Sequence, residues 1–269
     1  MGMSVNTNVG AMLALQNLNK SNKMLETTQL HITTGLKVNG PKDDAATYAI
    51  AQRMRGDIAG MGAVKTALSN GEATVNVAIT AGKAVADMLT EMKAKTVQAN
   101  QAGLDTASKD ALQNDFTSLR DQLTTIVQTA EFNGKNLITS AATSLTVLST
   151  VDGSSISVAA QKLDTTTLGI NASNISSGAS AALVAIDAAI NTVTSSLASL
   201  GSSSKRIDVQ AEFTVQLVDI LKEGVGNLVD ADLAEESAAL QSLQIKQQLG
   251  VQALSIANSG PQSILALFG

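Results

Sequence analysis

The sequence has no cysteine and no tryptophan, and it has only two prolines among its 269 residues. Without cysteine the chain can form no disulfide, no thiolate nucleophile and no thiolate metal site. Aromatic residues make up 2% of the chain, whereas hydrophobic residues of all kinds make up 44%. The core must therefore be built from Ala, Leu, Val, Ile and Met, which suit closely packed helices.

Positive charge is also scarce, since the formal net charge is −5 and Lys and Arg form no dense cluster. This balance argues against a nucleic-acid partner. No run approaches about 18 consecutive apolar residues, so we expect no membrane insertion. The first eight residues lack the basic flank and apolar run of a secretory signal, so a protein that leaves the cell would need another route.

Signals for catalysis are missing too. The chain has no phosphate-binding glycine loop and no nucleophile motif. His31 is the only histidine and has no second histidine or cysteine to share a metal. Asp43-Asp44 and Glu235-Glu236 are adjacent pairs, which do not face each other on a helix and are better explained as caps or solvated residues. We therefore predict no enzyme activity, no metal and no cofactor.

The N-terminal part of the chain predicts one amphipathic helix followed by a connector. Steps of three and four residues indicate a coiled-coil seam. The seam comprises Leu15, Leu18, Asn22, Leu25, Gln29 and Ile32. Gly35 and then Asn39, Gly40 and Pro41 are typical of a helix end and a turn, so residues 35–44 are expected to form the connector.

Two further helices are predicted before the middle of the chain, over about residues 45–100 and 108–130. Either Asp43 or Asp44 could cap the first of them. Its apolar stripe comprises Ile50, Met54, Met61, Leu68, Val75 and Leu89. The second carries Leu112, Phe116, Leu119, Leu123, Ile126 and Val127, and it closes at the turn dipeptide Asn133-Gly134.

Residues near 140–175 read as a small β region, because Leu145 and Val147 alternate before Asp152-Gly153, as do Ile156 and Val158 after it. A strict heptad pattern then predicts one long helix over about residues 179–230. Its seam comprises Leu183, Ile186, Ile190, Val193, Leu197 and Leu200, continued by Ile207, Ala211, Thr214, Val218, Leu221, Val225 and Leu228 if Ser204 fills the intervening position.

The last segment continues the helical spacing until Gly260-Pro261, where we expect the helix to break before an apolar tail. Pairing of the two terminal helices would bury part of each stripe, although such a pair is marginal alone. We therefore expect it to be disordered in the free subunit and ordered in an assembly. The predicted assembly interface comprises Val5, Leu15, Leu18, Leu25, Ile32, Leu240, Leu243, Leu254, Ile264, Leu265, Leu267 and Phe268.

These patterns predict a mainly α fold, a long antiparallel helical coiled-coil bundle with a small β-hairpin region and paired terminal helices. The expected domains are a terminal coiled coil of residues 3–34 and 235–269, the connector 35–44, and a long-helix domain of residues 45–234. Only about 40 residues separate the helical blocks, so we expect no outer variable domains.

Several stretches resemble the bacterial flagellin family. The N-terminal match comprises residues 4–8 (SVNTN), 30–39 (LHITTGLKVN), 42–46 (KDDAA) and 131–134 (EFNG). The C-terminal match comprises residues 230–236 (DADLAEE) and 243–267, including QQLG at 247–250. Finding both matches in order at the two ends makes the resemblance specific.

The resemblance implies a structural subunit of the flagellar filament that serves swimming motility. Such a subunit is exported unfolded by the flagellar type III apparatus and polymerised outside the cell into a hollow helical tube. Its implied partners are other copies of itself, related flagellins, the flagellar cap, hook-associated proteins and an export chaperone. The paired termini would line the inner tube, and the long helices and hairpin would form the outer tube.

The resemblance also suggests two surface properties. Family members carry O-glycans on exposed central residues, so Ser and Thr within residues 144–180 are candidates. Some are recognised by a vertebrate innate immune receptor through an Arg and a Leu, and alignment on Val97-Gln98 puts Glu91 and Lys95 at those positions. An anion and a solvated Lys there predict weak receptor activation.

Two alternatives remain open from the sequence. A hook–filament junction protein resembles flagellin at its ends and belongs to the same structural class. A monomeric secreted effector or adhesin built as a helical bundle would show similar seams. The apolar tail and the jointed terminal helices favour the assembling protein over the monomer.

Overall fold

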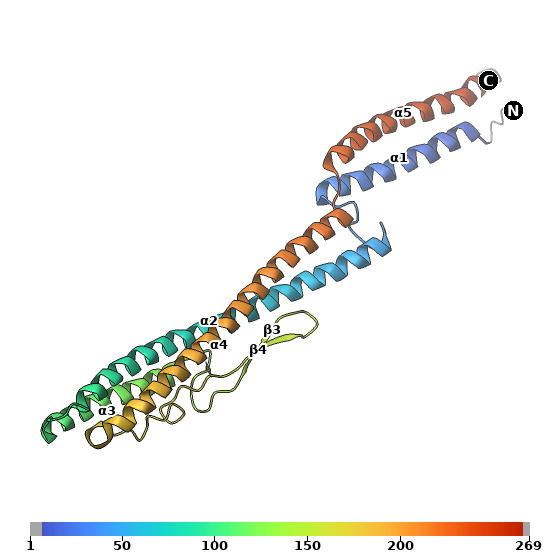
Figure 1. The fold of residues 1–269 in the computed structure, drawn as a ribbon. Coiled ribbons are helices and arrows are strands. Elements are labelled where there is room, and N and C mark those ends of the chain that lie inside the picture. Colours follow the sequence, from blue (N-terminus) through green and yellow to red (C-terminus); the bar gives the residue numbers. More distant parts are fainter. Residues whose placement is uncertain (1–6, 266–269) are drawn as a thin grey trace. The chain divides into compact units, whose positions relative to one another are not determined.

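The computed structural model describes residues 7–265, with side chains described through residue 259. It is mainly helical, as predicted (Figure 1). The elements in chain order are α1 (Val9–Thr34), α2 (Ala45–Ala99), α3 (Thr106–Thr129), β1 (Glu131–Phe132), β2 (Lys135–Asn136), β3 (Leu145–Leu148), β4 (Ser155–Val158), α4 (Ile175–Val229) and α5 (Leu233–Leu265). The chain divides into two compact units, residues 1–56 with 220–269 and residues 57–219.

Helix α1 ends where the sequence predicts. At its start, the Asn8 side-chain oxygen Oδ1 accepts a hydrogen bond from the Ala11 amide (3.0 Å). At its end, Gly35 adopts the left-handed conformation (φ 71°), and its amide donates to the His31 carbonyl (2.8 Å). Glycine has no Cβ to oppose that conformation, so the helix stops there at little cost.

The two neighbouring aspartates of the connector, Asp43 and Asp44, have different structural roles. Asp44 caps α2, because its Oδ1 accepts from the amides of Ala46 (3.0 Å) and Thr47 (3.2 Å). The hydrogen bond that the Thr47 hydroxyl donates to Asp44 is the largest cause of a lowered pKa at that carboxyl. Asp43 instead folds the connector, since its Oδ2 accepts from the amides of Asn39 (3.0 Å) and Gly40 (3.1 Å).

The connector also pairs with the junction between α4 and α5. The Lys37 amide donates to the Val229 carbonyl (2.8 Å), and the Ala231 amide donates to the Gly35 carbonyl (2.9 Å). Asp232 then caps α5 by accepting from the Ala234 amide (2.8 Å). The first compact unit therefore includes the connector and the adjoining ends of α2 and α4, whereas the sequence placed the limits of the terminal coil at residues 34 and 235.

The second unit has one core, built from α2, α3, α4 and the loops that join them (Figure 1). The predicted stripes of α3 and α4 are buried or half-buried at every position. The stripe of α2 is confirmed from Met54 onward, but Ile50 is wrong: it is 54% exposed, and its neighbour Ala51 is fully buried. The largest fully buried side chains from the three helices are Leu68, Leu89, Met92, Phe116, Leu123, Ile175, Ile186 and Leu200.

Two short hairpins connect α3 to α4. Asn133 (φ 50°) and Gly134 (φ 73°) form the two-residue turn between β1 and β2, as the Asn-Gly pair predicts. In the second hairpin β3 pairs antiparallel with β4, with Val147 opposite Ile156. Val147 and Val158 are buried, whereas Thr146 and Ser157 are exposed, so the hairpin covers the helices with one face.

Helix α4 begins at Ile175, four residues earlier than predicted. Asn174 Oδ1 accepts from the amides of Ser176 (3.0 Å) and Ser177 (3.1 Å), and Gln113 of α3 accepts from the Ile175 amide (2.7 Å). Gly178 then interrupts the helical backbone (φ −140°, ψ 43°). Asn174 therefore caps the helix, and Gly178 forms a kink within it.

Helix α4 is also long and apolar enough to cross a membrane by length and composition, with one 18-residue window of mean hydropathy 1.4. It is the one such helix among the described residues. The lack of about 18 consecutive apolar residues therefore did not exclude a helix of this length and mean hydropathy. The heptad positions of α4 from Ile186 to Ala211 pack into or against the core, and 28% of the apolar window is buried. Core helices of soluble proteins pass the same compositional test.

Candidate assembly surface of the terminal helices

Helices α1 and α5 pack antiparallel along one seam (Figure 1). On α1 a row of half-buried or buried positions recurs at steps of three and four, with the half-buried Asn22 and His31 beside it: Ala11, Ala14, Leu18, Ser21, Leu25, Thr28 and Ile32. On α5 such a row follows the same rule, with the half-buried Ala239 beside it: Glu236, Leu240, Leu243, Gln247, Gly250, Leu254 and Ala257. A Cβ on Gly250 would lie 3.1 Å from Leu18 Cδ1, which locates the close approach of the two helices.

The structure places the residues predicted for the terminal-helix interface as follows. Leu18, Leu25 and Ile32 lie in it, as do Leu240, Leu243 and Leu254. Leu15 is 46% exposed, and Ala14 takes the seam position instead. Gln29 is likewise exposed beside the buried Thr28. Val5 and the side chains of Ile264, Leu265, Leu267 and Phe268 lie outside the described residues.

Polar pairs cross the seam at defined places. Gln247 Nε2 donates to Asn22 Oδ1 (2.9 Å). Nearer the connector, His31 Nδ1 lies 2.7 Å from Glu236 Oε1, with both side chains less than one-fifth exposed. Since a polar pair in an apolar seam is satisfied in one register only, these contacts fix how α1 and α5 align. They also account for His31 and Glu236, for which no partner was predicted.

The outward faces of the two helices carry many large apolar side chains. On α1 the exposed ones are Val9, Met12, Leu13, Leu15, Met24 and Leu30. On α5 they are Leu233, Ile245, Leu249, Val251 and Ile256, and Ile256 is 72% exposed. We call these eleven residues the outward apolar surface. Large apolar side chains left exposed in this number are more typical of an interface than of a monomer's surface, so the outward apolar surface is a candidate interface.

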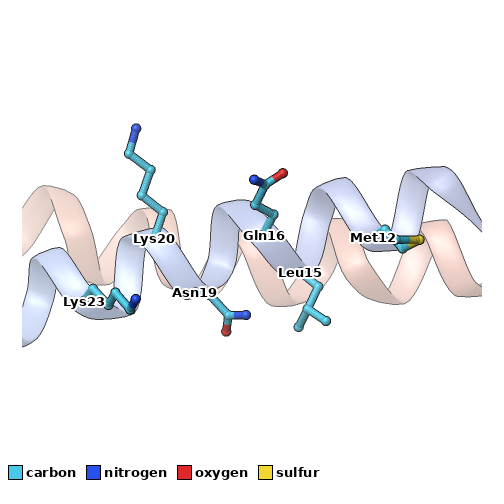
Figure 2. Close-up of a pocket in the computed structure, with 6 residues that line it drawn as sticks. All are labelled: Met12, Leu15, Gln16, Asn19, Lys20 and Lys23. Carbon is cyan, nitrogen blue, oxygen red and sulfur yellow. The ribbon is translucent and has the colours of Figure 1, made fainter.

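A shallow hollow of about 500 Å³ lies on the outward side of α1. Figure 2 shows its lining, in which the apolar side chains of Met12 and Leu15 are followed by the polar Gln16 and Asn19 and the cationic Lys20 and Lys23. It is open to solvent and formed by one helix. This is the shape of a contact surface between helices rather than of an enclosed substrate pocket.

Three of the four acidic residues considered above as possible catalytic pairs form hydrogen bonds that hold the fold together. Asp43, Asp44 and Glu236 make the hydrogen bonds described above, and Glu235 is exposed in the first turn of α5. Among the residues that the structure describes, no group of three or more His, Asp or Glu side chains could hold a metal ion.

The surface positions inferred from the resemblance lie in the second unit. Glu91 is exposed on α2, and Lys95 Nζ forms an ion pair with Asp115 Oδ2 of α3 (2.6 Å). Within residues 144–180, Ser149 and Thr165 are buried. The exposed Ser and Thr there are Ser144, Thr146, Ser154, Ser155, Ser157, Thr166, Thr167, Ser177 and Ser180.

Comparison with known proteins agrees with this architecture. Residues 5–143 match the family model of the bacterial flagellin N-terminal helical region, and residues 183–268 match that of the C-terminal helical region. Flagellin FljK of Caulobacter vibrioides is 48% identical over 268 residues, covering 98% of both chains. A flagellin of Brucella melitensis is 37% identical over 280 aligned residues, covering 98% of this chain and 99% of that one.

A solved structure described as a flagellar hook-associated protein from Vibrio parahaemolyticus shares the fold. Its TM-score is 0.58 with 14% identity, and the match covers 70% of this chain and all of that one. The family models and the close relatives, by contrast, are those of flagellins. The chain therefore belongs to the bacterial flagellin family, whose members are the structural subunits of the flagellar filament.

Proposed function

We propose that the chain polymerises through the outward apolar surface of α1 and α5 into a hollow helical tube. The single observation that carries this proposal is the row of large apolar side chains left in water on both helices. Burying them against neighbouring copies gains about 25 cal/mol per Å² removed from water. Residues 3–34 and 235–269 would then form the inner tube and residues 45–234 the outer one.

The outward apolar surface also gives a reason for the terminal helices to become ordered only on assembly. Each terminal helix buries one narrow stripe against the other, and this seam includes small and polar residues such as Ala14, Ser21 and Asn22. A two-helix pair of this kind is marginally stable in water. We infer that neighbouring copies supply the missing burial, so that the terminal helices are disordered in the free subunit.

The remaining parts of the proposal follow from family membership. The subunit would be exported unfolded through the flagellar type III apparatus with the help of a chaperone, and added beneath the cap to an extracellular filament that begins at hook-associated proteins. Related flagellins would share the filament. Its role would be structural rather than catalytic, in swimming motility.

Electron microscopy after dissociation and seeded reassembly tests the proposal. The full chain should extend seeds into long tubes with a central channel. A variant lacking residues 240–269 should lose polymerisation and keep the fold of the unit formed by residues 57–219. A full chain that stayed monomeric with seeds present would instead favour a junction protein or a secreted helical-bundle effector.

Point variants locate the interface. Ile256→Ser removes an exposed apolar side chain from α5 and should raise the critical concentration for assembly about tenfold, which corresponds to about 1.4 kcal/mol. Val184→Ser is the matched control, because Val184 is similarly exposed (70%) but lies on α4. Equal effects of the two variants would contradict an interface centred on the terminal helices.

We propose that the filament is thin and smooth, without outer domains. Residues 137–174 hold only the β3–β4 hairpin and loops, and the loops bury Leu137, Ile138, Leu163 and Ile170 in the core of the second unit. O-glycosylation is proposed for the exposed Ser and Thr named above. Density projecting well beyond the helical tube would contradict the first proposal, and an intact mass equal to that of the bare chain would contradict the second.

We also propose that the innate receptor recognises this chain weakly. Glu91 presents an anion where recognised flagellins carry a cation, and Lys95 is engaged with Asp115. A reporter cell should respond weakly to purified protein and more strongly to the double variant Glu91→Arg, Lys95→Leu. Strong signalling by the unmodified protein at low dose would contradict this proposal.

A further inference from the structure

Helix α5 contains a proline that the sequence predicts should end it. The helix runs from Leu233 to Leu265, so the prediction of a break at Gly260-Pro261 is wrong. A proline has no amide hydrogen, so Pro261 cannot donate to the carbonyl four residues before it. That carbonyl belongs to Ala257, which therefore needs a donor from elsewhere.

The missing donor comes from the other end of the chain. Asn8 Nδ2 donates to the Ala257 carbonyl oxygen at 2.7 Å. The same side chain uses its oxygen to cap α1, since Oδ1 accepts from the Ala11 amide at 3.0 Å. One asparagine thus satisfies an orphan amide of α1 and an orphan carbonyl of α5 at once.

We propose that Asn8 is a positioning residue for assembly, which fixes α1 against α5 by supplying the hydrogen-bond donor that Pro261 removes from α5. The inference rests on the proposed function, because an interface formed by two helices needs both in one register. Only an amide side chain suits both roles: aspartate would cap α1 but has no donor, and serine is shorter and has a single hydroxyl.

Alignment of the seam supports this role. Asn8 with Ala257, Asn22 with Gln247 and His31 with Glu236 are all satisfied in the same antiparallel register. A slip of α1 by one heptad would bring Leu15 to the Ala257 carbonyl, and Leu15 has no side-chain donor. The Ala257 carbonyl would then be unpaired, which costs free energy in a partly buried site.

A double-mutant cycle in the full chain tests the proposal, with the critical concentration for seeded growth as the readout. Asn8→Asp keeps the capping oxygen and removes the donor, so it should raise the critical concentration about tenfold. Pro261→Ala restores a helical donor to Ala257. In that background Asn8→Asp should raise the critical concentration less than about twofold.

Asn19→Asp is the matched control, since Asn19 is an exposed asparagine of α1 outside the seam. Asn19→Asp should change the critical concentration by the same factor whether residue 261 is proline or alanine. Asn8→Ser repeats the cycle without adding charge and keeps the test valid if the aspartate variant does not assemble. An effect of Asn8 substitution that does not depend on residue 261 would overturn the proposal.

The results distinguish a failure of the proposed polymerisation from a failure of the proposed role of Asn8. If the unmodified chain does not extend seeds, the proposed function fails, and with it the expected disorder of the terminal helices in the free subunit. The same cycle is then read from the thermal unfolding of the terminal helices in the monomer by circular dichroism. If the unmodified chain polymerises but the effects at Asn8 and Pro261 are additive, polymerisation stands and the role of Asn8 is refuted.

Discussion

Substitution of Gly71 by alanine should reveal how tightly the β3–β4 hairpin sits on α2. A Cβ at Gly71 would lie 2.5 Å from Cγ2 and 2.9 Å from Cγ1 of Val147, closer than real Cβ atoms approach their neighbours. Val147 is buried and paired with Ile156, and its β-branched side chain has little rotational freedom. The hairpin backbone must therefore move to admit the methyl group.

Two effects of opposite sign combine at this site. Forcing a methyl group into a packed core costs about 1–3 kcal/mol. Replacing glycine by alanine inside a helix gains about 1 kcal/mol. Gly62→Ala isolates the second effect, because Gly62 lies on the same helix and a Cβ there would meet nothing within 4 Å. Gly71→Ala should therefore be less stable than Gly62→Ala by about 1–3 kcal/mol.

Urea unfolding of the monomeric chain, followed by circular dichroism, measures both variants. Gly62→Ala should raise the unfolding midpoint, and Gly71→Ala should leave it unchanged or lower it. Adding Val147→Ala to Gly71→Ala should relieve the clash, so that the double variant is more stable than the sum of the single effects predicts. Equal midpoints for the two glycine variants would refute the proposed packing of the hairpin on α2.

Three further substitutions test other parts of the fold. Phe116→Ala empties a fully buried site of α3 and should lower the free energy of unfolding by about 3–5 kcal/mol, measured by urea unfolding. Leu243→Ala removes a side chain of α5 that is 5% exposed, so it should raise the critical concentration while leaving the urea unfolding of residues 57–219 unchanged. Asp44→Ala removes the cap of α2 and should lower the midpoint of urea unfolding near neutral pH. Because the pKa of Asp44 is lowered in the folded chain, this stabilisation should be present above about pH 4 and be lost as the pH falls through the folded pKa.

Local features of the sequence were enough for most of the helical architecture. Gly35, Asn133-Gly134 and the heptads of α4 act through preferred dihedral angles and side-chain periodicity within a few residues, so their effects could be read directly. The flagellin motifs at the two ends likewise depend on residue identity alone. Asn174 is a local helix cap of the same kind. It was missed because the neighbouring serines and glycine made the segment look like a loop.

Surface exposure was harder to predict, because an apolar residue at helical spacing fits more than one face. Ile50 and Leu15 both match an apolar stripe, yet each is about half exposed, Ile50 beside the buried Ala51 and Leu15 beside the half-buried Ala14. Which of two neighbouring positions turns inward depends on how closely the facing helix approaches, as Gly250 does at Leu18. That distance is a property of the packed pair and not of either helix alone.

The sequence by itself determined the helical class, the C-terminal end of α1, the hairpin turn and the family. Only the tertiary structure decided the register of α1 on α5, the different roles of Asp43 and Asp44, and the passage of α5 through Pro261. The last case shows the physical reason. Pro261 removes the helical donor of the Ala257 carbonyl, and the hydrogen bond to that carbonyl comes instead from Asn8, 249 residues away along the chain.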